Sequence, residues 1–450
     1  MKMNRLAFDS MMNWYKDPLR KPLIIWGARQ VGKTYLIKEL FLPEFKNGLY
    51  IDLKKDDDAR SFFSTTSDPE KYLKYIEARY GIIITPETPL IFDEVQLCPN
   101  VLSSLKYFCQ DRRELPVIAT GSMVRLALRH DNDPDFLFPV GKVDEIDLFP
   151  ISFREYLMAA NPSLLTTICD SYASGRVMER YEHDMAMDAL YEYLTIGGMP
   201  EALEVFLSTG SYVNAGKVVR SVYSNYLSDM DTYNVSPETI LKTMNVYKSI
   251  YSQLNKANRN YKISAVEKNK SNRDYFNAYQ WLELARVVYR SKALSGKVPM
   301  PIPNDDSGLF RLYLADPGIF TYQSGLPQSD FFVREKRNTL SGIFYENYVA
   351  CELVSKGIPL RYWTGKSSHG FEFVVQIGNE AVPIDVKKSG GKMNSLDSFR
   401  EHNRKALAVK VSSDNYGYDE NTDVLTIPLY EAFLLAEDIA AGNDPVHKRR

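Results

Sequence analysis

Residues 22–34 place an apolar strand directly before a glycine-rich loop. They read Pro22-Leu23-Ile24-Ile25-Trp26-Gly27-Ala28-Arg29-Gln30-Val31-Gly32-Lys33-Thr34, which contains the complete pattern G-x-x-x-x-G-K-T. The two glycines let the backbone wrap so that successive N–H groups face a phosphate chain, while Lys33 reaches the terminal phosphates and Thr34 offers its hydroxyl to Mg²⁺. A plain glycine turn is the alternative, but the strand, the loop and the following helical pattern all agree with the motif. We therefore predict that residues 27–34 bind a nucleotide.

The composition narrows the class of protein. The chain has 450 residues, 44% of them hydrophobic and 25% charged, which is typical of a globular protein with two or three domains. A net charge of -2 gives no overall attraction to nucleic acid or to an anionic membrane. The four cysteines lie far apart without a C-x-x-C pair, which favours reduced thiols and argues against a zinc site. Because the chain shows no signal-peptide pattern and no apolar run of membrane-spanning length, we expect a cytoplasmic protein with no membrane partner.

Two further apolar runs end in polar residues that suit nucleotide chemistry. Residues 89–96 read PLIFDEVQ, a buried strand followed by Asp93, which would bind Mg²⁺, and Glu94, which would polarise the attacking water. Residues 115–122 read LPVIATGS, where the hydroxyls of Thr120 and Ser122 are candidates to sense the γ-phosphate. The alternatives are helix N-cap carboxylates in the first run and a glycine turn in the second. The catalytic candidates are therefore Lys33, Glu94 and Thr120, and the metal-ligand candidates are Thr34 and Asp93.

Strand and helix patterns alternate across residues 20–150. A strand is expected over residues 48–53 and a helix over residues 69–80, whose apolar positions share one face. This alternation predicts an α/β fold with a parallel sheet that is covered on both faces. The nucleotide should lie at the carboxyl ends of the strands.

The motifs together resemble a known family. The stretches GARQVGKT, FDEVQ and ATGS, followed by FPISFREY at residues 149–156, are similar to those of prokaryotic AAA+ type ATPases that carry a C-terminal domain of unknown function. The resemblance implies ATP and Mg²⁺ as cofactors and an oligomer in which an arginine acts across a subunit interface. The family usually has Gly-Arg before the last element, whereas this chain has Gly141-Lys142, and lysine lacks the planar fork of arginine. Arg125, Arg129 and Lys142 are the candidates for that contact.

The middle of the chain carries helical patterns and a basic segment. The resemblance implies a helical lid over residues 151–235, in which the sequence GGMPEA at residues 197–202 forms either a hinge or a plain turn. Helices expected over residues 238–254 and 274–289 and a strand over 309–314 suggest a winged-helix-like domain at residues 236–335. Residues 255–297 hold ten basic residues against three acidic ones, a local charge of +7. This segment suits contacts to DNA phosphates, or it is a solvated face that contacts protein.

The last part of the chain, residues 336–450, resembles the core of PD-(D/E)xK nucleases. A helix opening near residue 340 carries Glu346, a strand at 370–375 carries Glu372, and a strand at 382–387 carries Asp385 and Lys387. In that arrangement Glu372 and Asp385 would bind Mg²⁺, Lys387 would activate water, and Glu346 would add a carboxylate. The relatives more often have Asp at the first position and Glu at the second. A surface pattern of paired charges, or a nuclease-like fold that only binds a partner, is the alternative.

Three functions are consistent with these patterns. The leading hypothesis is an ATP-binding and ATP-hydrolysing regulatory or remodelling ATPase, with the ATPase core at residues 1–150. The second is an ATP-gated DNA-processing nuclease. The third is a nucleotide-dependent switch that binds DNA or a protein client without significant turnover.

Overall fold

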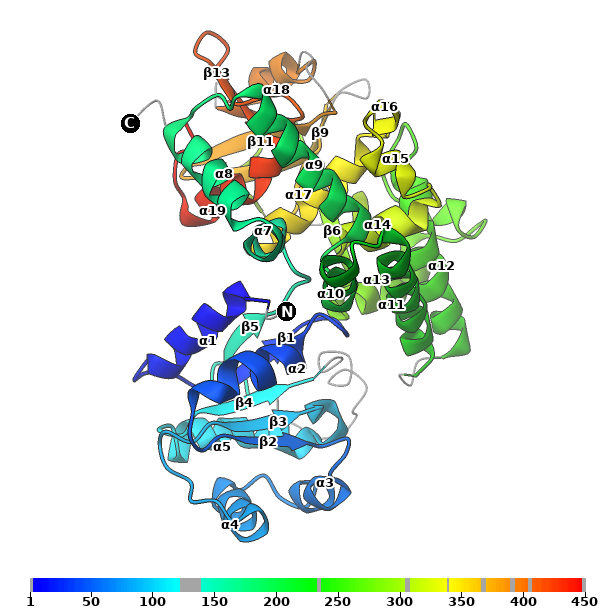
Figure 1. Ribbon diagram of the computed structural model, residues 1–450. Helices are drawn as coiled ribbons and strands as arrows, with labels where there is room; N and C mark the ends of the chain where they lie inside the picture. Colours follow the sequence, from blue (N-terminus) through cyan, green and yellow to red (C-terminus); the bar gives the residue numbers. More distant parts are fainter. Residues whose placement is uncertain are drawn as a thin grey trace.

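The computed structural model describes residues 3–121, 139–232, 236–303, 308–337, 340–365, 370–388, 393–403 and 407–446. In Figure 1 a parallel sheet with its helices, coloured blue to cyan, forms the lower part of the molecule, and the green, yellow and red segments form the upper part. Within the described residues, no helix combines the length and the apolar character that crossing a membrane requires.

The N-terminal sheet has five parallel strands in the order β2-β3-β4-β1-β5. The strands are β1 (Leu23–Trp26), β2 (Leu49–Asp52), β3 (Leu90–Asp93), β4 (Val117–Thr120) and β5 (Asp144–Asp147). All residues of β1, β3 and β4 are buried, as expected for a parallel sheet covered on both faces. β4 lies between β1 and β3, so its carboxyl end lies beside those of both motif-bearing strands. The parallel sheet predicted from the alternation is therefore confirmed.

Alternate strand residues pack against different helices. Leu23, Ile25 and Ile118 face the side with α1 and the helical stretch after the glycine-rich loop, whereas Ile24 and Phe92 face α3, α4 and α5. The helical elements are α1 (Leu6–Lys16), α2 (Lys33–Tyr35), the π-helical η1 (Leu36–Phe41), η2 (Leu42–Glu44), α3 (Asp57–Phe63), α4 (Pro69–Tyr80), η3 (Val95–Leu97) and α5 (Pro99–Asp111). Each of these buried aliphatic or aromatic side chains stabilises the fold by roughly 1.5–3 kcal/mol.

Five helices follow the sheet. They are α7 (Phe153–Ala160), α8 (Pro162–Ser174), α9 (Arg180–Ile196), α10 (Pro200–Thr209) and α11 (Tyr212–Thr232). Ser152 and Glu155 form a capping box that starts α7. The glycine pair between α9 and α10 is a tightly packed joint, because a Cβ at Gly198 would collide with the carbonyl oxygen of Ile151. Asp316 Oδ2 accepts a hydrogen bond of 2.6 Å from the Gly198 N–H.

A helix pair and an antiparallel strand pair occupy the next segment. They comprise α12 (Pro237–Leu254), η4 (Ile263–Ala265), η5 (Asn272–Tyr275), α13 (Phe276–Leu284), β6 (Val288–Ser295) and β7 (Phe310–Leu314). The helix expected over residues 274–289 ends early and the prediction was wrong there. Arg286 has a left-handed backbone with φ of 61°, and the strand-forming residues Val287, Val288 and Tyr289 follow it. β6 also pairs in parallel with β8 (Arg361–Thr364), so this segment shares a sheet with the C-terminal part.

The C-terminal part is built around α17 (Ile343–Ser355), most of which is buried. The mixed sheet has the order β10-β11-β12-β14-β13, and the other sheet has the order β7-β6-β8-β9. The remaining elements are α14 (Pro317–Ser324), α15 (Ser329–Phe332), α16 (Arg334–Arg337), β9 (Gly370–Phe371), β10 (Phe373–Ile377), β11 (Glu380–Val386), α18 (Leu396–His402), β12 (Ala408–Ser412), β13 (Gly417–Asp419), β14 (Val424–Pro428), η6 (Leu429–Glu431) and α19 (Ala432–Ala441).

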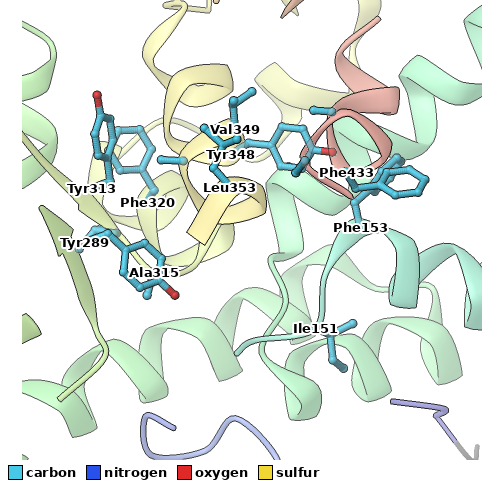
Figure 2. Packing of buried hydrophobic residues seen from close by; sticks show 14 of the residues in the cluster. Ile151, Phe153, Tyr289, Tyr313, Ala315, Phe320, Tyr348, Val349, Leu353 and Phe433 are labelled. Carbon is cyan, nitrogen blue, oxygen red and sulfur yellow. The ribbon is translucent and has the colours of Figure 1, made fainter. Parts of the chain in front are cut away.

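One large apolar core joins the helical region to the C-terminal part. Figure 2 shows Phe153 of α7 beside Phe433 of α19, and their ring centroids lie 6.1 Å apart. Phe153 also contacts Tyr348 of α17 edge to face, with centroids 6.2 Å apart. The same cluster extends to Leu23 and Ile25 of β1. The segments after residue 150 therefore share one continuous apolar core and are not separate domains joined by exposed linkers.

Candidate nucleotide-binding site

The glycine-rich loop lies between the carboxyl end of β1 and the start of α2. Gly32 adopts φ of 94°, a left-handed conformation that glycine adopts without strain, and a Cβ at Gly27 would lie 2.6 Å from the carbonyl oxygen of Leu148. Ala28 and Val31 are buried, while Arg29, Gln30 and Thr34 are exposed. The buried apolar residues therefore anchor the loop, while its polar side chains face solvent.

Lys33 is buried and turned toward its own loop. Its Nζ donates hydrogen bonds to the carbonyl oxygens of Gly27 at 2.8 Å and Ala28 at 2.7 Å. Burial lowers the pKa of Lys33 to about 8, while the nearby carboxylates of Glu94 and Asp93 raise it in part. An anionic ligand at this position would stabilise the charged ammonium.

Asp93 and Thr34 lie close together, with Tyr50 between them. The Tyr50 hydroxyl donates a short hydrogen bond to Asp93 Oδ2 and also interacts with the Thr34 side chain. Asp93 Oδ1 accepts the Glu94 N–H at 2.9 Å. Burial raises the pKa of the Asp93 carboxyl, and the Tyr50 hydrogen bond opposes that shift. Tyr50 was not foreseen from the sequence, because only the pairing of β2 with β3 brings it beside Asp93.

Glu94 has a left-handed backbone, with φ of 56°. Its Oε2 accepts a short hydrogen bond from the side-chain amide of Gln96. The other amide atom, Gln96 Oε1, is buried and has no hydrogen-bond partner among the residues that the structure describes. Non-glycine residues in this backbone region are typical of functional sites, and Gln96 fixes the direction of the carboxylate.

Thr120 lies at the end of β4, one position beyond the pair formed by Phe92 and Ala119. Its side chain is fully buried, and its Oγ1 has no hydrogen-bond partner within the described part of the chain. A buried hydroxyl without a partner is unusual and suits a site that a ligand or water completes. Ser122, Arg125 and Arg129 lie outside the described residues.

Lys142 lies at the amino end of the parallel strands, whereas the loop lies at their carboxyl end. It precedes β5, whose Asp144 pairs with Leu23 at the amino end of β1. The glycine-rich loop follows Trp26 at the carboxyl end. Lys142 is therefore about one strand length away from the loop of its own chain.

Side chains from distant segments complete a cavity of about 400 Å³. Its lining includes Lys33, Thr34, Asp93 and Glu94 together with Arg5, Glu201 and Glu204. Arg5 pairs with Glu155 at 3.0 Å and donates to the carbonyl oxygens of Val31 at 2.9 Å and Phe149 at 2.7 Å. Arg5 therefore links the loop, through the Val31 carbonyl oxygen, to Glu155 in the first turn of α7. Neither this role nor the acidic wall from α10 was predicted, because no local pattern marks them.

Helix α11 contacts the loop directly. The guanidinium of Arg29 forms a short ion pair with Asp229, and the Tyr226 hydroxyl donates to the Arg29 carbonyl oxygen at 2.8 Å. The side chain of Asp229 is only 5% exposed, and in the described ranges its Oδ2 has no hydrogen-bond partner. The helical region is thus tied to a residue of the phosphate-loop pattern.

The C-terminal residues singled out from the sequence gather in one place. Glu346 comes from α17, and Glu372 lies between β9 and β10. Asp385 lies near the end of β11, and Lys387 directly follows that strand. Arginine side chains contact two of these carboxylates, which the sequence did not indicate. No group of three or more His, Cys, Asp or Glu side chains in the described ranges is arranged to hold a metal ion. The metal role of these residues stays a prediction.

Several charges of the basic segment are neutralised within the fold. Arg286 pairs with Asp147 through contacts of 2.6 and 2.7 Å, and Arg290 pairs with Glu283 at 3.0 Å. Arg259 pairs with the C-terminal carboxylates. The local charge of +7 therefore overstates the charge that residues 255–297 offer to a partner.

Family models match three parts of the chain. Residues 19–157 match a model described as an AAA domain. Residues 187–330 and 341–430 match two models described as domains of unknown function, DUF8612 and DUF4143. No curated protein matched the chain.

Three solved structures to which this chain is similar have TM-scores below 0.5. The Walker-type ATPase PABY2304 of Pyrococcus abyssi is 14% identical over 72% of this chain and 96% of its own, with a TM-score of 0.45. The Aeropyrum pernix ORC2 protein in ADPNP–ADP complexes is 13% identical over 74% and 92%, with a TM-score of 0.33. AMPPCP-bound DnaA from Aquifex aeolicus is 12% identical over 62% and 88%, with a TM-score of 0.28.

The AAA match and the geometry agree. The matched residues contain the glycine-rich loop, the Asp93-Glu94 pair and the five-stranded parallel sheet. Residues 19–157 of this chain are therefore an AAA-type P-loop ATPase domain.

Proposed function

We propose that the chain binds Mg²⁺–ATP in the cavity beside the glycine-rich loop and hydrolyses it. One observation carries the proposal: Lys33 and Thr34 from one motif and Asp93 and Glu94 from another line the same cavity. These are the side chains that phosphoryl transfer to water requires.

The residues present fit the nucleotide and its metal. The loop has the tight backbone of a phosphate cradle. The Thr120 hydroxyl, which has no hydrogen-bond partner among the described residues, does not line the cavity, and its role as a γ-phosphate sensor requires an ordered water to connect it to the ligand. Thr34 and Asp93 offer the oxygen atoms that Mg²⁺ prefers. When bound there, Mg²⁺ would neutralise charge on the phosphates.

The protein side chains then have distinct tasks. Lys33 exchanges its two carbonyl partners for phosphate oxygens, and Glu94 accepts a proton from the attacking water. Gln96 must release or redirect Glu94 for this step, because it holds one carboxylate oxygen. Tyr50 must give up Asp93, because its hydroxyl bonds the carboxylate that would bind the metal.

Equilibrium binding of a fluorescent ATP analogue tests the assignment. Lys33→Ala should abolish binding, whereas Lys74→Ala on the exposed face of α4 is the matched control and should bind normally. Glu94→Gln should retain binding and lose most hydrolysis. Full affinity in Lys33→Ala would remove the assignment of the site, and unchanged turnover in Glu94→Gln would remove the role of Glu94.

A second candidate function, a nucleotide-dependent switch, is favoured by the contact between the loop and α11. Arg29 belongs to the phosphate-loop pattern and pairs with Asp229, so a phosphate that draws the guanidinium away breaks one of the two contacts between the loop and α11. Amide hydrogen exchange over residues 212–232 should change when ATP binds. Asp229→Asn should shift the ATP-free protein toward the ATP-bound exchange pattern, and an unaltered pattern in both experiments would count against the switch.

We also propose the four-part organisation of residues 1–150, 151–235, 236–335 and 336–450. The order α12, α13, β6, β7 suits a winged helix, and we propose a nuclease-like fold for the C-terminal part. The client is DNA or another protein, and a regulatory or remodelling role follows from an ATPase joined to such modules. The exposed basic residues for a phosphate backbone are Lys256, Lys262, Lys268, Arg273 and Lys297. Salt-dependent DNA binding that weakens in a Lys262→Ala and Lys268→Ala double variant would support DNA, and binding without salt dependence would oppose it.

A further inference from the structure

Asp316 carries a buried carboxylate at the point where α14 begins. The residue is 2% exposed. Its Oδ1 accepts the Ile319 N–H at 2.8 Å, which is the ordinary bond of an aspartate that caps a helix. Its Oδ2 accepts the Gly198 N–H at 2.6 Å, from a residue 118 positions earlier in the chain. Capping requires only the first bond, and the second links α14 to the joint between α9 and α10.

Backbone N–H groups, rather than a cation, hold this carboxylate. Arg286 lines the same small cavity as Asp316, but its guanidinium is paired with a carboxylate of β5. Burial raises the pKa of the Asp316 carboxyl to about 6, and hydrogen bonds from the N–H groups of Ile319, Gly198 and Gly318 oppose that shift. A buried carboxylate is costly unless it is bonded in this way, and capping alone could be done by an uncharged side chain.

The joint between α9 and α10 is fixed from two sides. Gly197 has φ of 82° and ψ of -171°, a conformation that is essentially restricted to glycine, and a Cβ there would lie 2.3 Å from Asp316 Oδ1. The Gly198 N–H donates to Asp316, while the Gly198 carbonyl oxygen accepts the Ile151 N–H at 2.7 Å. Gly198 therefore cannot turn without breaking one of these bonds.

Helix α10 begins directly after this joint and contacts the glycine-rich loop. A Cβ on Gly32 would lie 3.3 Å from Pro200 Cγ, so the first residue of α10 packs against the glycine that precedes Lys33. Glu201 and Glu204 of the same helix line the nucleotide cavity with Pro200. A shift of the joint therefore moves a wall of that cavity.

Asp316 is itself anchored by β7 and α17. Leu314, the last residue of β7, donates its N–H to Asn347 Oδ1 at 2.9 Å, and its carbonyl oxygen accepts a bond of 3.1 Å from Asn347 Nδ2. Asn347 is a fully buried residue of α17. A Cβ on Gly318 would lie 2.2 Å from the carbonyl oxygen of Ile196, so α14 also packs directly on the end of α9. The carboxylate is thus presented to the joint from packed elements outside the ATPase domain.

We propose that Asp316 is a positioning residue for the ATP site, which holds the Gly197-Gly198 joint so that the first turn of α10 forms a wall of the nucleotide cavity. It acts through Gly198 and Pro200 and does not touch the nucleotide. The proposal rests on the proposed function, because it takes ATP as the ligand of that cavity. The ATP site is then completed by a residue that lies outside the AAA match at residues 19–157.

This role makes ATP affinity depend on the charge of Asp316. A protonated carboxyl carries a hydrogen on one oxygen and is a poorer acceptor for one of its two N–H partners. Because the pKa is about 6, ATP affinity should be full above that pH and fall as the pH is lowered through it. Arg286 stays charged throughout. Burial raises the pKa of the other titratable groups that face Asp316, so they stay neutral near pH 6: Tyr193 of α9, Tyr226 of α11, Tyr247 of α12, Tyr289 of β6 and Cys351 of α17.

Equilibrium binding of a fluorescent ATP analogue to the full chain at about pH 7.5 and about pH 5.5 tests the proposal. Asp316→Asn keeps the shape of the side chain but turns an amide NH₂ toward one backbone N–H, so the dissociation constant at the higher pH should rise about 3- to 10-fold. The further loss of affinity at the lower pH should be smaller in the variant than in the parent, because asparagine does not titrate. Asp68→Asn changes the aspartate that caps α4, and as the matched control it should bind like the parent at both pH values.

A second variant separates positioning from capping. Asp316→Ser keeps a capping hydroxyl for the Ile319 N–H but is too short to reach Gly198, so it should weaken ATP binding as Asp316→Asn does. In hydrolysis assays both variants should raise the KM for ATP while kcat changes by less than about twofold, because Lys33 and Glu94 are unchanged. Thermal unfolding identifies the folded variants.

Amide hydrogen exchange of the parent tests the same bond without a substitution. Exchange over residues 196–200, corrected for its intrinsic pH dependence, should become faster when the pH is lowered through 6. Unchanged protection there would overturn the role of Asp316, and so would a folded Asp316→Asn or Asp316→Ser protein with the affinity and pH dependence of the parent. A parent that does not bind the analogue would instead remove the proposed function.

Discussion

Replacing Tyr50 by Phe should make the ATP site bind Mg²⁺ more tightly. The Tyr50 hydroxyl bonds Asp93 Oδ2 and interacts with Thr34, so it competes for the two side chains that we assign to the metal. Phenylalanine keeps the ring, and with it the contact of Lys38 Nζ 3.9 Å from the ring centroid. The substitution therefore removes the competing hydroxyl and little else.

The expected magnitude follows from the bond that Mg²⁺ must displace. A hydrogen bond to a charged group contributes roughly 1.5–3 kcal/mol, and each 1.4 kcal/mol changes an equilibrium constant about tenfold. Part of that energy returns when the freed hydroxyl is solvated. We therefore expect the Mg²⁺ concentration for half-maximal hydrolysis to fall by about 3- to 30-fold in Tyr50→Phe.

Mg²⁺ titrations of ATP hydrolysis at saturating ATP measure this quantity. Tyr80→Phe is the matched control, because Tyr80 donates a similar bond of 2.7 Å to Asp56 away from the cavity. It should leave the Mg²⁺ requirement unchanged. A Tyr50→Phe protein that needs more Mg²⁺ than the parent would refute the reasoning, since it would mean that the hydroxyl orients Asp93 for the metal.

Two further substitutions test the architecture. Arg5→Ala should destabilise the ATPase domain by about 3 kcal/mol and weaken ATP binding, because the buried Glu155 carboxylate loses its cation and the Val31 carbonyl oxygen loses its donor. Thermal unfolding with and without ATP measures this effect, and an unchanged melting temperature would exclude it. Burial raises the pKa of Glu352 to about 7 from its ordinary 4.5, so the folded protein holds a proton that the unfolded protein releases, and stability should fall as pH rises from 4.5 to 7. Glu352→Gln should flatten that part of the melting profile, and an identical slope in both proteins would rule out Glu352 as its source.

The ATPase core was predictable because its signals are contiguous. The loop at residues 27–34 and the Asp93-Glu94 pair each follow an apolar strand, and parallel strands bring such endings to one edge of a sheet. The order of the strands was not predictable in the same way. Only the insertion of β4 between β1 and β3 places Thr120 level with Asp93.

The residues missed at the site act across long separations. Tyr50, Arg5 and Asp229 reach it from a neighbouring strand, an N-terminal segment and a helix far along the chain. No spacing rule links them to the loop. Single polar residues of this kind look like ordinary surface positions until the fold brings them inward.

The basic segment shows a different limit of sequence analysis. The composition correctly indicates an excess of positive charge at residues 255–297, but it does not show which way each charged side chain faces. Arg259, Arg286 and Arg290 turn to carboxylates of the same chain. Two of those partners, Glu372 and Asp147, lie outside the segment, so a local charge count cannot detect the neutralisation.

Lys142 lies too far from the loop of its own chain to contact a bound phosphate, so Arg29 is the cation to consider there. A four-residue strand spans roughly 13 Å, so a lysine before the amino end of β5 cannot reach a phosphate at the carboxyl end in its own chain. Among the described residues, the cations that line the cavity are Arg5, Arg29 and Lys33, and Arg5 is committed to Glu155. The Arg29 side chain is 46% exposed, and its Nη1 pairs with Asp229. The side chain that can add positive charge to the phosphates is therefore the one that pairs with Asp229 of α11, so a phosphate that draws it away would break that ion pair.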